Sequence, residues 1–169
     1  QASDTGYING IEVFAVKETN EIIVHKTKEA IEKGEKVICK IDWEKRYARM
    51  QNHSGEHIIS GIVHKMFGYT NSGFHMADSL MTVDFSGPLS EEDIKKIEFE
   101  SNLAIYKNAA ITSSFPTKEE AESIEYRSKL DIESGLRLIT IDGIDCCACC
   151  APHVRYTGEI GIIKILDFA

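Results

Sequence analysis

The chain has 169 residues, of which 43% are hydrophobic and 27% charged, and 19 Lys and Arg against 27 Asp and Glu give a net charge of −8. This composition is ordinary for a soluble globular protein, and the negative charge argues against broad, sequence-independent nucleic-acid binding, which requires clustered Lys and Arg. No apolar run approaches the roughly 20 residues that cross a bilayer, and no signal peptide opens the chain. The sequence therefore predicts a cytoplasmic protein without a membrane partner.

Strands are predicted in the first 41 residues. Three runs rich in β-branched residues are separated by polar, turn-forming segments. They are Ile11–Val16, Glu21–His25 and Lys36–Ile41. We expect a small sheet or a barrel before residue 42.

A long helix is predicted next. Asp42 can cap its N-terminus, an apolar stripe runs from Ile58 to Met66, and Gly68 can end it at about Phe67. Four cations near its start form either a local basic patch or a solvated helix face: Lys40, Lys45, Arg46 and Arg49.

Strands and helices alternate in the rest of the chain. Gly73–Phe85 predicts one long strand or a strand pair, and Ser90 can cap a second helix that reaches about Lys107. The remaining expectations are a strand at Ile111–Phe115, a short acidic helix at Lys118–Glu125, and closing strands at Arg137–Ile141 and Ile160–Leu166. This order predicts an α+β fold, a two-layer sandwich in which two long helices pack on one face of an antiparallel sheet.

Two pairs of residues can share a metal ion. His53 and His57 lie one turn apart on the predicted helix, about 6 Å along its axis, so that both imidazoles can point at one ion. Cys149 and His153 have the same spacing in a predicted loop, and zinc accepts this mixture of nitrogen and sulfur ligands. The four residues form a Cys-His₃ set that predicts one Zn²⁺ per chain. The alternative is a buried structural cysteine with three unrelated histidines.

Three more cysteines surround the second pair. Cys146, Cys147 and Cys150 create, with Cys149, two overlapping C-x-x-C spacings. A cytoplasmic cluster of this kind is more typical of a metal or redox site than of disulfides. A redox pair or another zinc ligand set stays open, although neither explains the two helix histidines. His75 lies in a glycine-containing segment that can line a pocket.

Five segments together match one family in order and spacing. They are Gln1–Gly6, Asp42–His53, Ile141–Asp145, Cys149–Val154 and Thr157–Gly161. In these segments the chain resembles the freestanding alanyl-tRNA editing proteins and the editing domains of alanyl-tRNA synthetases, and the resemblance covers nearly its whole length.

The resemblance implies a function. The Cys-His₃ set would bind zinc, Ser54 would sense the substrate from a position usually held by threonine, and the protein would hydrolyse tRNA(Ala) mischarged with serine or glycine. A helix-interior serine that bonds to its own backbone is the alternative for Ser54. Residues 1–41 would be the C-terminal part of an N-terminal β-barrel-like region, and residues 42–169 the zinc-binding editing domain. The start inside the family's glycine-rich segment suggests a fragment that lacks part of the barrel.

Other functions stay open. The residues Cys150-Ala-Pro152 replace the family's usual Gly-Gly-Thr and resemble the threonyl-tRNA synthetase editing domain, which makes tRNA(Thr) an alternative partner. His53-x-x-Glu56-His57 also matches the inverted zinc-protease signature, with Glu56 as general base. A non-catalytic zinc module that binds tRNA or a synthetase is the third possibility. Four protein ligands close the site as in structural zinc, so catalysis needs a fifth position, loss of a ligand or a water held elsewhere.

Overall fold

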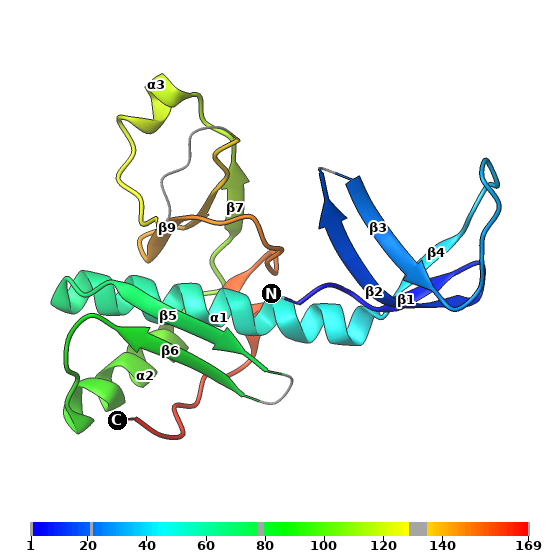
Figure 1. The fold of residues 1–169 in the computed structure, drawn as a ribbon. Helices are drawn as coiled ribbons and strands as arrows, with labels where there is room; N and C mark the ends of the chain where they lie inside the picture. Colours follow the sequence, from blue (N-terminus) through cyan, green and yellow to red (C-terminus); the bar gives the residue numbers. More distant parts are fainter. Residues whose placement is uncertain (1, 21, 78–79, 129–134, 169) are drawn as a thin grey trace. The chain divides into compact units, whose positions relative to one another are not determined.

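The computed structural model describes residues 2–20, 22–77, 80–128 and 135–168 (Figure 1). Four residues of the predicted segments, Gln1, Glu21, Asp78 and Ser79, lie outside the described part. The chain forms two compact units, residues 1–49 and 50–169. The domain boundary expected between residues 41 and 42 stays a prediction.

The first unit contains a four-stranded antiparallel sheet in the order β3-β2-β1-β4. The strands are β1 (Gly6–Ile8), β2 (Ile11–Thr19), β3 (Ile22–Thr27) and β4 (Cys39–Ile41). The strands predicted before residue 42 are confirmed, and β1 adds one in the polar opening segment. Asn9 and Gly10, with φ of 49° and 83°, form the two-residue turn between β1 and β2, a sequence that favours hairpins. Closure of these strands into a barrel stays a prediction.

Two of the four cations in the predicted basic patch bind within the first unit. Arg46 forms an ion pair with Asp4, and Nη1 of Arg49 donates to the carbonyl oxygen of Ser3 at 2.9 Å. These contacts attach the opening segment to the first turns of α1 (Trp43–Phe67). The patch therefore has a structural role for at least two of its members.

The long helix α1 has the predicted ends. Asp42 caps it, because its Oδ1 accepts a hydrogen bond from the backbone N–H of Lys45 at 3.2 Å. Gly68 ends it with a φ of +71°, and its N–H donates to the carbonyl of His64 at 2.8 Å. A left-handed residue at this position is the usual way to close a helix.

The second unit combines helices with two antiparallel sheets. One is the hairpin β5-β6, and the other has the order β7-β8-β9. Its elements after α1 are β5 (Asn71–Met76), β6 (Met81–Phe85), α2 (Glu91–Tyr106), β7 (Ile111–Ser114), α3 (Lys118–Ala121), β8 (Leu138–Ile141), β9 (Asp145–Ala148) and the 3₁₀ turn η1 (Thr157–Ile160). The α+β class is confirmed, whereas the packing of both long helices on one sheet stays a prediction.

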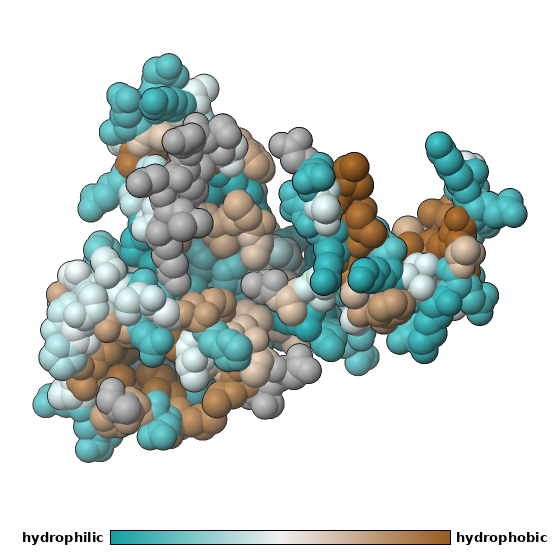
Figure 2. All heavy atoms as spheres, in the orientation of Figure 1, coloured by the Kyte–Doolittle hydropathy of each residue, from teal (hydrophilic) through white to brown (hydrophobic). Residues whose placement is uncertain are grey.

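Two groups of apolar side chains make the core of the second unit. Ile58 of α1 packs with Ala104 and Ile105 of α2 and with Ile141 of β8. In the second group, Ile59 and Val63 of α1 pack with Ile97 of α2. Figure 2 shows further hydrophobic residues at the surface, and Ile162, for example, is 80% exposed. No helix in the described part of the chain is long and apolar enough to cross a membrane.

The strand predicted at Ile160–Leu166 is wrong. η1 ends at Ile160, and the residues after it, described through 168, form no strand. Side chains of α2 satisfy their backbone instead: Asn102 accepts from the N–H of Ile163 at 3.0 Å and donates to its carbonyl at 2.8 Å. Glu98 accepts from the N–H of Ile165 at 2.6 Å. The backbone groups of Ile163 and Ile165 are thus bonded to side chains of α2. This segment therefore needs no neighbouring strand, although its apolar, branched residues are typical of one.

Replacing Glu98 with glutamine should make the protein less stable in a pH-dependent way. Hydrogen bonds from Lys164 and from the N–H of Ile165 lower the pKa of Glu98 below its ordinary 4.5. The ionised carboxylate therefore stabilises the fold above that ordinary value, and this contribution is lost as the pH falls through the lowered pKa. Urea unfolding of both proteins should show a difference at pH 7 that vanishes in acid. Glu122→Gln, at an exposed position, is the control, and an equal difference at all pH values would contradict this assignment.

Candidate metal centre

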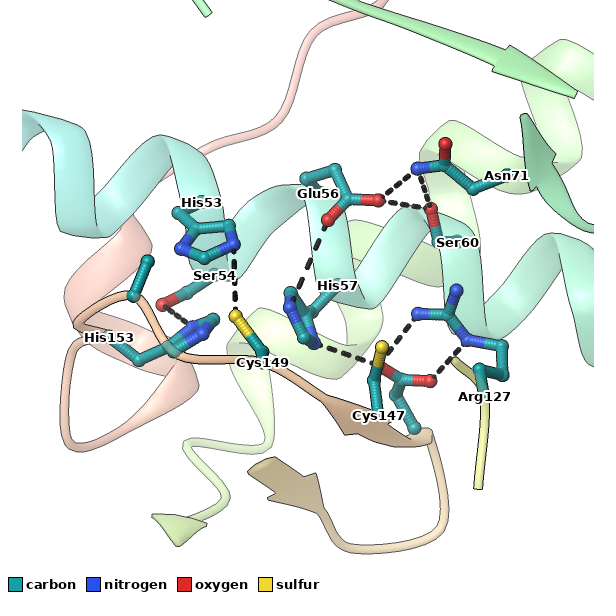
Figure 3. Close-up of polar contacts among 12 residues, drawn as sticks. His53, Ser54, Glu56, His57, Ser60, Asn71, Arg127, Cys147, Cys149 and His153 are labelled. Carbon is teal, nitrogen blue, oxygen red and sulfur yellow. Dashed lines mark hydrogen bonds and ion pairs between the residues drawn. The ribbon is translucent and has the colours of Figure 1, made fainter. Parts of the chain in front are cut away.

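The four residues of the Cys-His₃ set come together in the second unit. α1 carries His53 and His57 on one face, and the loop after β9 carries Cys149 and His153 (Figure 3). One ligand atom from each of them lies within 4.8 Å of all the others. The sulfur of Cys149 is 3.5 Å from Nε2 of His53. The chain thus places groups that can hold a metal ion at one point, although the pairs are far apart in sequence.

A carboxylate orients His57. Nδ1 of His57 lies 2.9 Å from Oδ2 of Asp145, and because a carboxylate can only accept, Nδ1 carries the proton. In the neutral form of the ring, Nε2 then has the lone pair that can bind a metal ion. Arg127 holds the same carboxylate with two hydrogen bonds, Nε to Oδ1 at 2.7 Å and Nη2 to Oδ2 at 2.9 Å. No local pattern in the sequence indicated a role for Arg127, and Asp145 belonged only to a segment that matches the family.

Ser54 contacts Nδ1 of His153, the ring nitrogen that is not the candidate metal ligand. Its side chain is fully buried, with Oγ 3.1 Å from Nδ1 of His153 and accepting from the N–H of Val154 at 3.2 Å. This hydroxyl therefore fixes the orientation of the His153 ring. A role in sensing the substrate stays a prediction.

The donor set fits a zinc ion. Nε2 of His153 is buried and has no hydrogen-bond partner among the described residues, while Nδ1 of the same ring is occupied by Ser54. A buried ring nitrogen without a partner is unfavourable unless something binds it. Thiolate sulfur and imidazole nitrogen are the ligands that zinc prefers over carbonyl and carboxylate oxygen.

The ionisation of the cysteines separates Cys149 from its neighbours. Burial acts to raise the pKa of Cys149, but the imidazoles around it, His153 first, outweigh burial and lower this pKa to about 3. Burial raises the pKa of Cys147 to about 12, with Arg127 opposing it. At neutral pH the thiolate form, which binds metals, is thus held at Cys149 rather than at Cys147.

The other cysteines take different positions. Cys147 is buried, Cys146 is partly exposed and Cys150 is exposed. Cys147 forms a second group with His57 and Asp145 whose atoms also lie within 4.8 Å of one another. In that group the carboxylate is already bound by Arg127 and the Nδ1 proton of His57, which makes it the weaker metal site of the two.

A hairpin residue covers one side of the centre. Phe74 of β5 stacks on His53 with ring centroids 6.0 Å apart, whereas the next residue, His75, is exposed. Successive residues of a strand point to opposite faces. The structure therefore brings Phe74 against the ligands and leaves the predicted pocket residue His75 on the other face.

A buried carboxylate lies next to His57. Glu56 is 5% exposed, and its Oε1 accepts hydrogen bonds from Ser60, at 2.5 Å, and from the side chain of Asn71. Its other oxygen, Oε2, is 4.0 Å from Nε2 of His57 (Figure 3). Glu56 therefore borders the candidate ligands from α1 itself.

Open space adjoins the centre on the side of Asp145. A cavity of about 830 Å³ has Asn71, Arg127, Asp145 and Cys147 among its lining residues. None of the four candidate ligands lines it. Cys149 and His153 are only half-buried, whereas His53 and His57 are buried, so the loop pair is the more exposed half of the candidate ligand set.

The sequence of this region matches a known domain. A family model described as the threonyl and alanyl tRNA synthetase second additional domain matches residues 136–167. The match includes β8, β9 and both loop ligands, Cys149 and His153. Residues 136–167 of the second unit are therefore similar to part of that domain.

The similarity to particular proteins extends over nearly the whole chain. The alanyl-tRNA editing protein Aarsd1 of Danio rerio is 29% identical across 98% of this chain and 41% of its own length. The alanyl-tRNA editing protein AlaX-L of Pyrococcus horikoshii is 30% identical across 99% of this chain and 44% of its own length. An alanine–tRNA ligase of Ignicoccus hospitalis is 32% identical across 99% of this chain and 20% of its own length. The chain is a relative of alanyl-tRNA editing proteins and alanine–tRNA ligases, which confirms the resemblance, and it spans less than half the length of each of these three.

Proposed function

We propose that this chain is an aminoacyl-tRNA deacylase that removes serine or glycine from mischarged tRNA(Ala) at a zinc centre. The observation that carries the proposal is the meeting of two histidines from α1 with a cysteine and a histidine from the loop after β9, in a chain whose relatives include alanyl-tRNA editing proteins. The partner is then tRNA, and the zinc ligands are His53, His57, Cys149 and His153.

The residues of the chain would act mainly by positioning. Hydrolysis of an activated ester is chemically undemanding, so that holding the ester in place can supply much of the rate. Zinc, when bound, supplies Lewis acidity at this point. Asp145 holds His57 by its Nδ1, Ser54 holds His153, and the ring of Phe74 covers His53. The ligand side chains are thus fixed before any substrate arrives.

Hydrolysis of charged tRNAs by the purified protein tests the proposal. The substrates are tRNA(Ala) carrying serine, glycine or alanine, and Ser-tRNA(Thr), since the Cys150-Ala-Pro152 insert resembles the threonyl editing domain. We expect serine and glycine to be released from tRNA(Ala) while Ala-tRNA(Ala) stays intact. Faster release from Ser-tRNA(Thr) would shift the assignment to threonyl editing.

The two rival functions give different results. A metalloprotease that uses Glu56 as general base would cleave members of a peptide library and leave Ser-tRNA(Ala) intact. A non-catalytic module would bind tRNA in a mobility-shift assay and hydrolyse none of the substrates. Either result would overturn the proposed deacylase.

A further inference from the structure

Glu56 differs from the other buried carboxylate of the centre in its partners. Asp145 is neutralised by two hydrogen bonds from Arg127. Glu56 is equally buried, yet in the described part of the chain no Lys or Arg forms an ion pair with it, and it accepts hydrogen bonds from the uncharged side chains of Ser60 and Asn71. The nearest group that can carry a positive charge is His57, with Nε2 4.0 Å from Oε2, but a ring that binds a metal ion through Nε2 is neutral. With the ion bound, Glu56 would be a buried carboxylate without a cation, which is costly, and such a group is usually matched by a bound charge.

The two carboxylate oxygens of Glu56 have different contacts. Oε1 accepts from Ser60 and from Asn71, which fixes the rotamer of the side chain. Oε2 is directed toward Nε2 of His57, but at 4.0 Å it is too far for a hydrogen bond to that ring. This oxygen therefore presents its lone pairs next to the candidate ligands.

We propose that Oε2 of Glu56 binds the α-ammonium group of the amino acid that is esterified to the tRNA. This inference rests on the proposed function. An aminoacyl ester carries one cation, its ammonium group, two bonds from the carbonyl carbon that is attacked. A fixed carboxylate beside the ligands would accept a hydrogen bond from it and orient the carbonyl toward the centre. Glu56 is thus a substrate-binding residue of this chain, not a general base.

The rival role for Glu56 is to offset the charge of the metal. A dication bound to one thiolate and three neutral imidazoles keeps one positive charge, and a nearby carboxylate would balance it. That role predicts that loss of the carboxylate weakens metal binding and affects every substrate equally. Recognition of the ammonium group predicts an effect only on ligands that carry it.

Glu56→Gln is the variant that separates these roles. The amide oxygen of glutamine can still accept from Ser60 and Asn71, so that the buried network is kept. The amide nitrogen then takes the place of Oε2 and offers a donor where the ammonium group needs an acceptor. Glu92→Gln, at an exposed position on α2, is the matched control.

Two stable analogues of the substrate provide the measurement. One is 3′-(L-serylamino)-3′-deoxyadenosine, and the other has a hydroxyl in place of its α-ammonium group. Titration calorimetry on the zinc-loaded protein should show about 10- to 100-fold tighter binding of the ammonium analogue. In Glu56→Gln this preference should fall to within about twofold, with the zinc content unchanged, whereas Glu92→Gln should keep it.

Any of four results would overturn the inference. Equal affinity of the wild type for both analogues, or an undiminished preference in Glu56→Gln, would show that Oε2 does not bind the ammonium group. Loss of zinc from Glu56→Gln with the preference intact would assign Glu56 to the metal. Binding of neither analogue together with intact Ser-tRNA(Ala) would instead remove the proposed function, and the inference with it.

Discussion

Replacing Cys149 with alanine should remove zinc from the protein and abolish deacylation. Cys149 is the only sulfur among the four converging ligands, and its loss leaves three imidazoles without the thiolate that offsets the charge of the metal. Metal analysis after dialysis should fall from about one zinc per chain to near zero. We expect the release of serine from Ser-tRNA(Ala) to fall in parallel.

The neighbouring cysteine gives a stringent comparison. Cys147 is the more buried of the two and lies only two residues away, yet its pKa is raised to about 12 and it is not among the four ligands. Cys147→Ala should keep its zinc. Zinc lost from this variant and kept in Cys149→Ala would assign the metal to the group formed by Cys147, His57 and Asp145.

Asp145→Asn should lower both stability and zinc affinity. The substitution leaves Arg127, whose side chain is only 14% exposed, without its negative partner, and breaking a buried pair in this way costs about 3–5 kcal/mol. It also weakens the hydrogen bond that orients His57, and loss of such outer partners typically reduces metal affinity about 10- to 100-fold.

Urea unfolding and competition with a chelator measure the two effects. Asp142→Asn is the control, because Asp142 lies in the turn before β9 and is exposed. The double variant Asp145→Asn/Arg127→Gln should recover part of the lost stability, since no uncompensated charge is left buried. If Asp145→Asn and Arg127→Gln, each made alone, unfold like the wild type, the ion pair between Asp145 and Arg127 has no structural role.

Local signals made α1 and its two histidines predictable. Asp42 and Gly68 mark the ends of the helix through contacts with residues three or four positions away. The spacing of His53 and His57 then places them on one face. The pairing of this face with Cys149 and His153 came from the family resemblance and the chemistry of the ligands, not from any local pattern.

Long-range partners explain what could not be predicted. The segment after Ile160 has the composition of a strand, but its backbone is bound by Glu98 and Asn102, more than 60 residues earlier. Likewise, Arg127 lies 18 positions from Asp145, and no spacing rule links them. Whether Phe74 or His75 contacts the candidate ligands depends on which face of β5 packs against α1. Alternation of side chains within one strand does not specify that face.

The arrangement of the ligands has a consequence for folding. His53 and Cys149 are 96 positions apart, so an ion held by both would be a reversible cross-link between the middle of α1 and the loop after β9. Such an ion binds the folded chain and not the unfolded one, and it adds free energy in proportion to the logarithm of its concentration over Kd. Zinc binding and folding of this domain would then be one coupled equilibrium. As the zinc concentration falls toward Kd, the free energy of unfolding would decrease before the fraction of active, zinc-bound protein does.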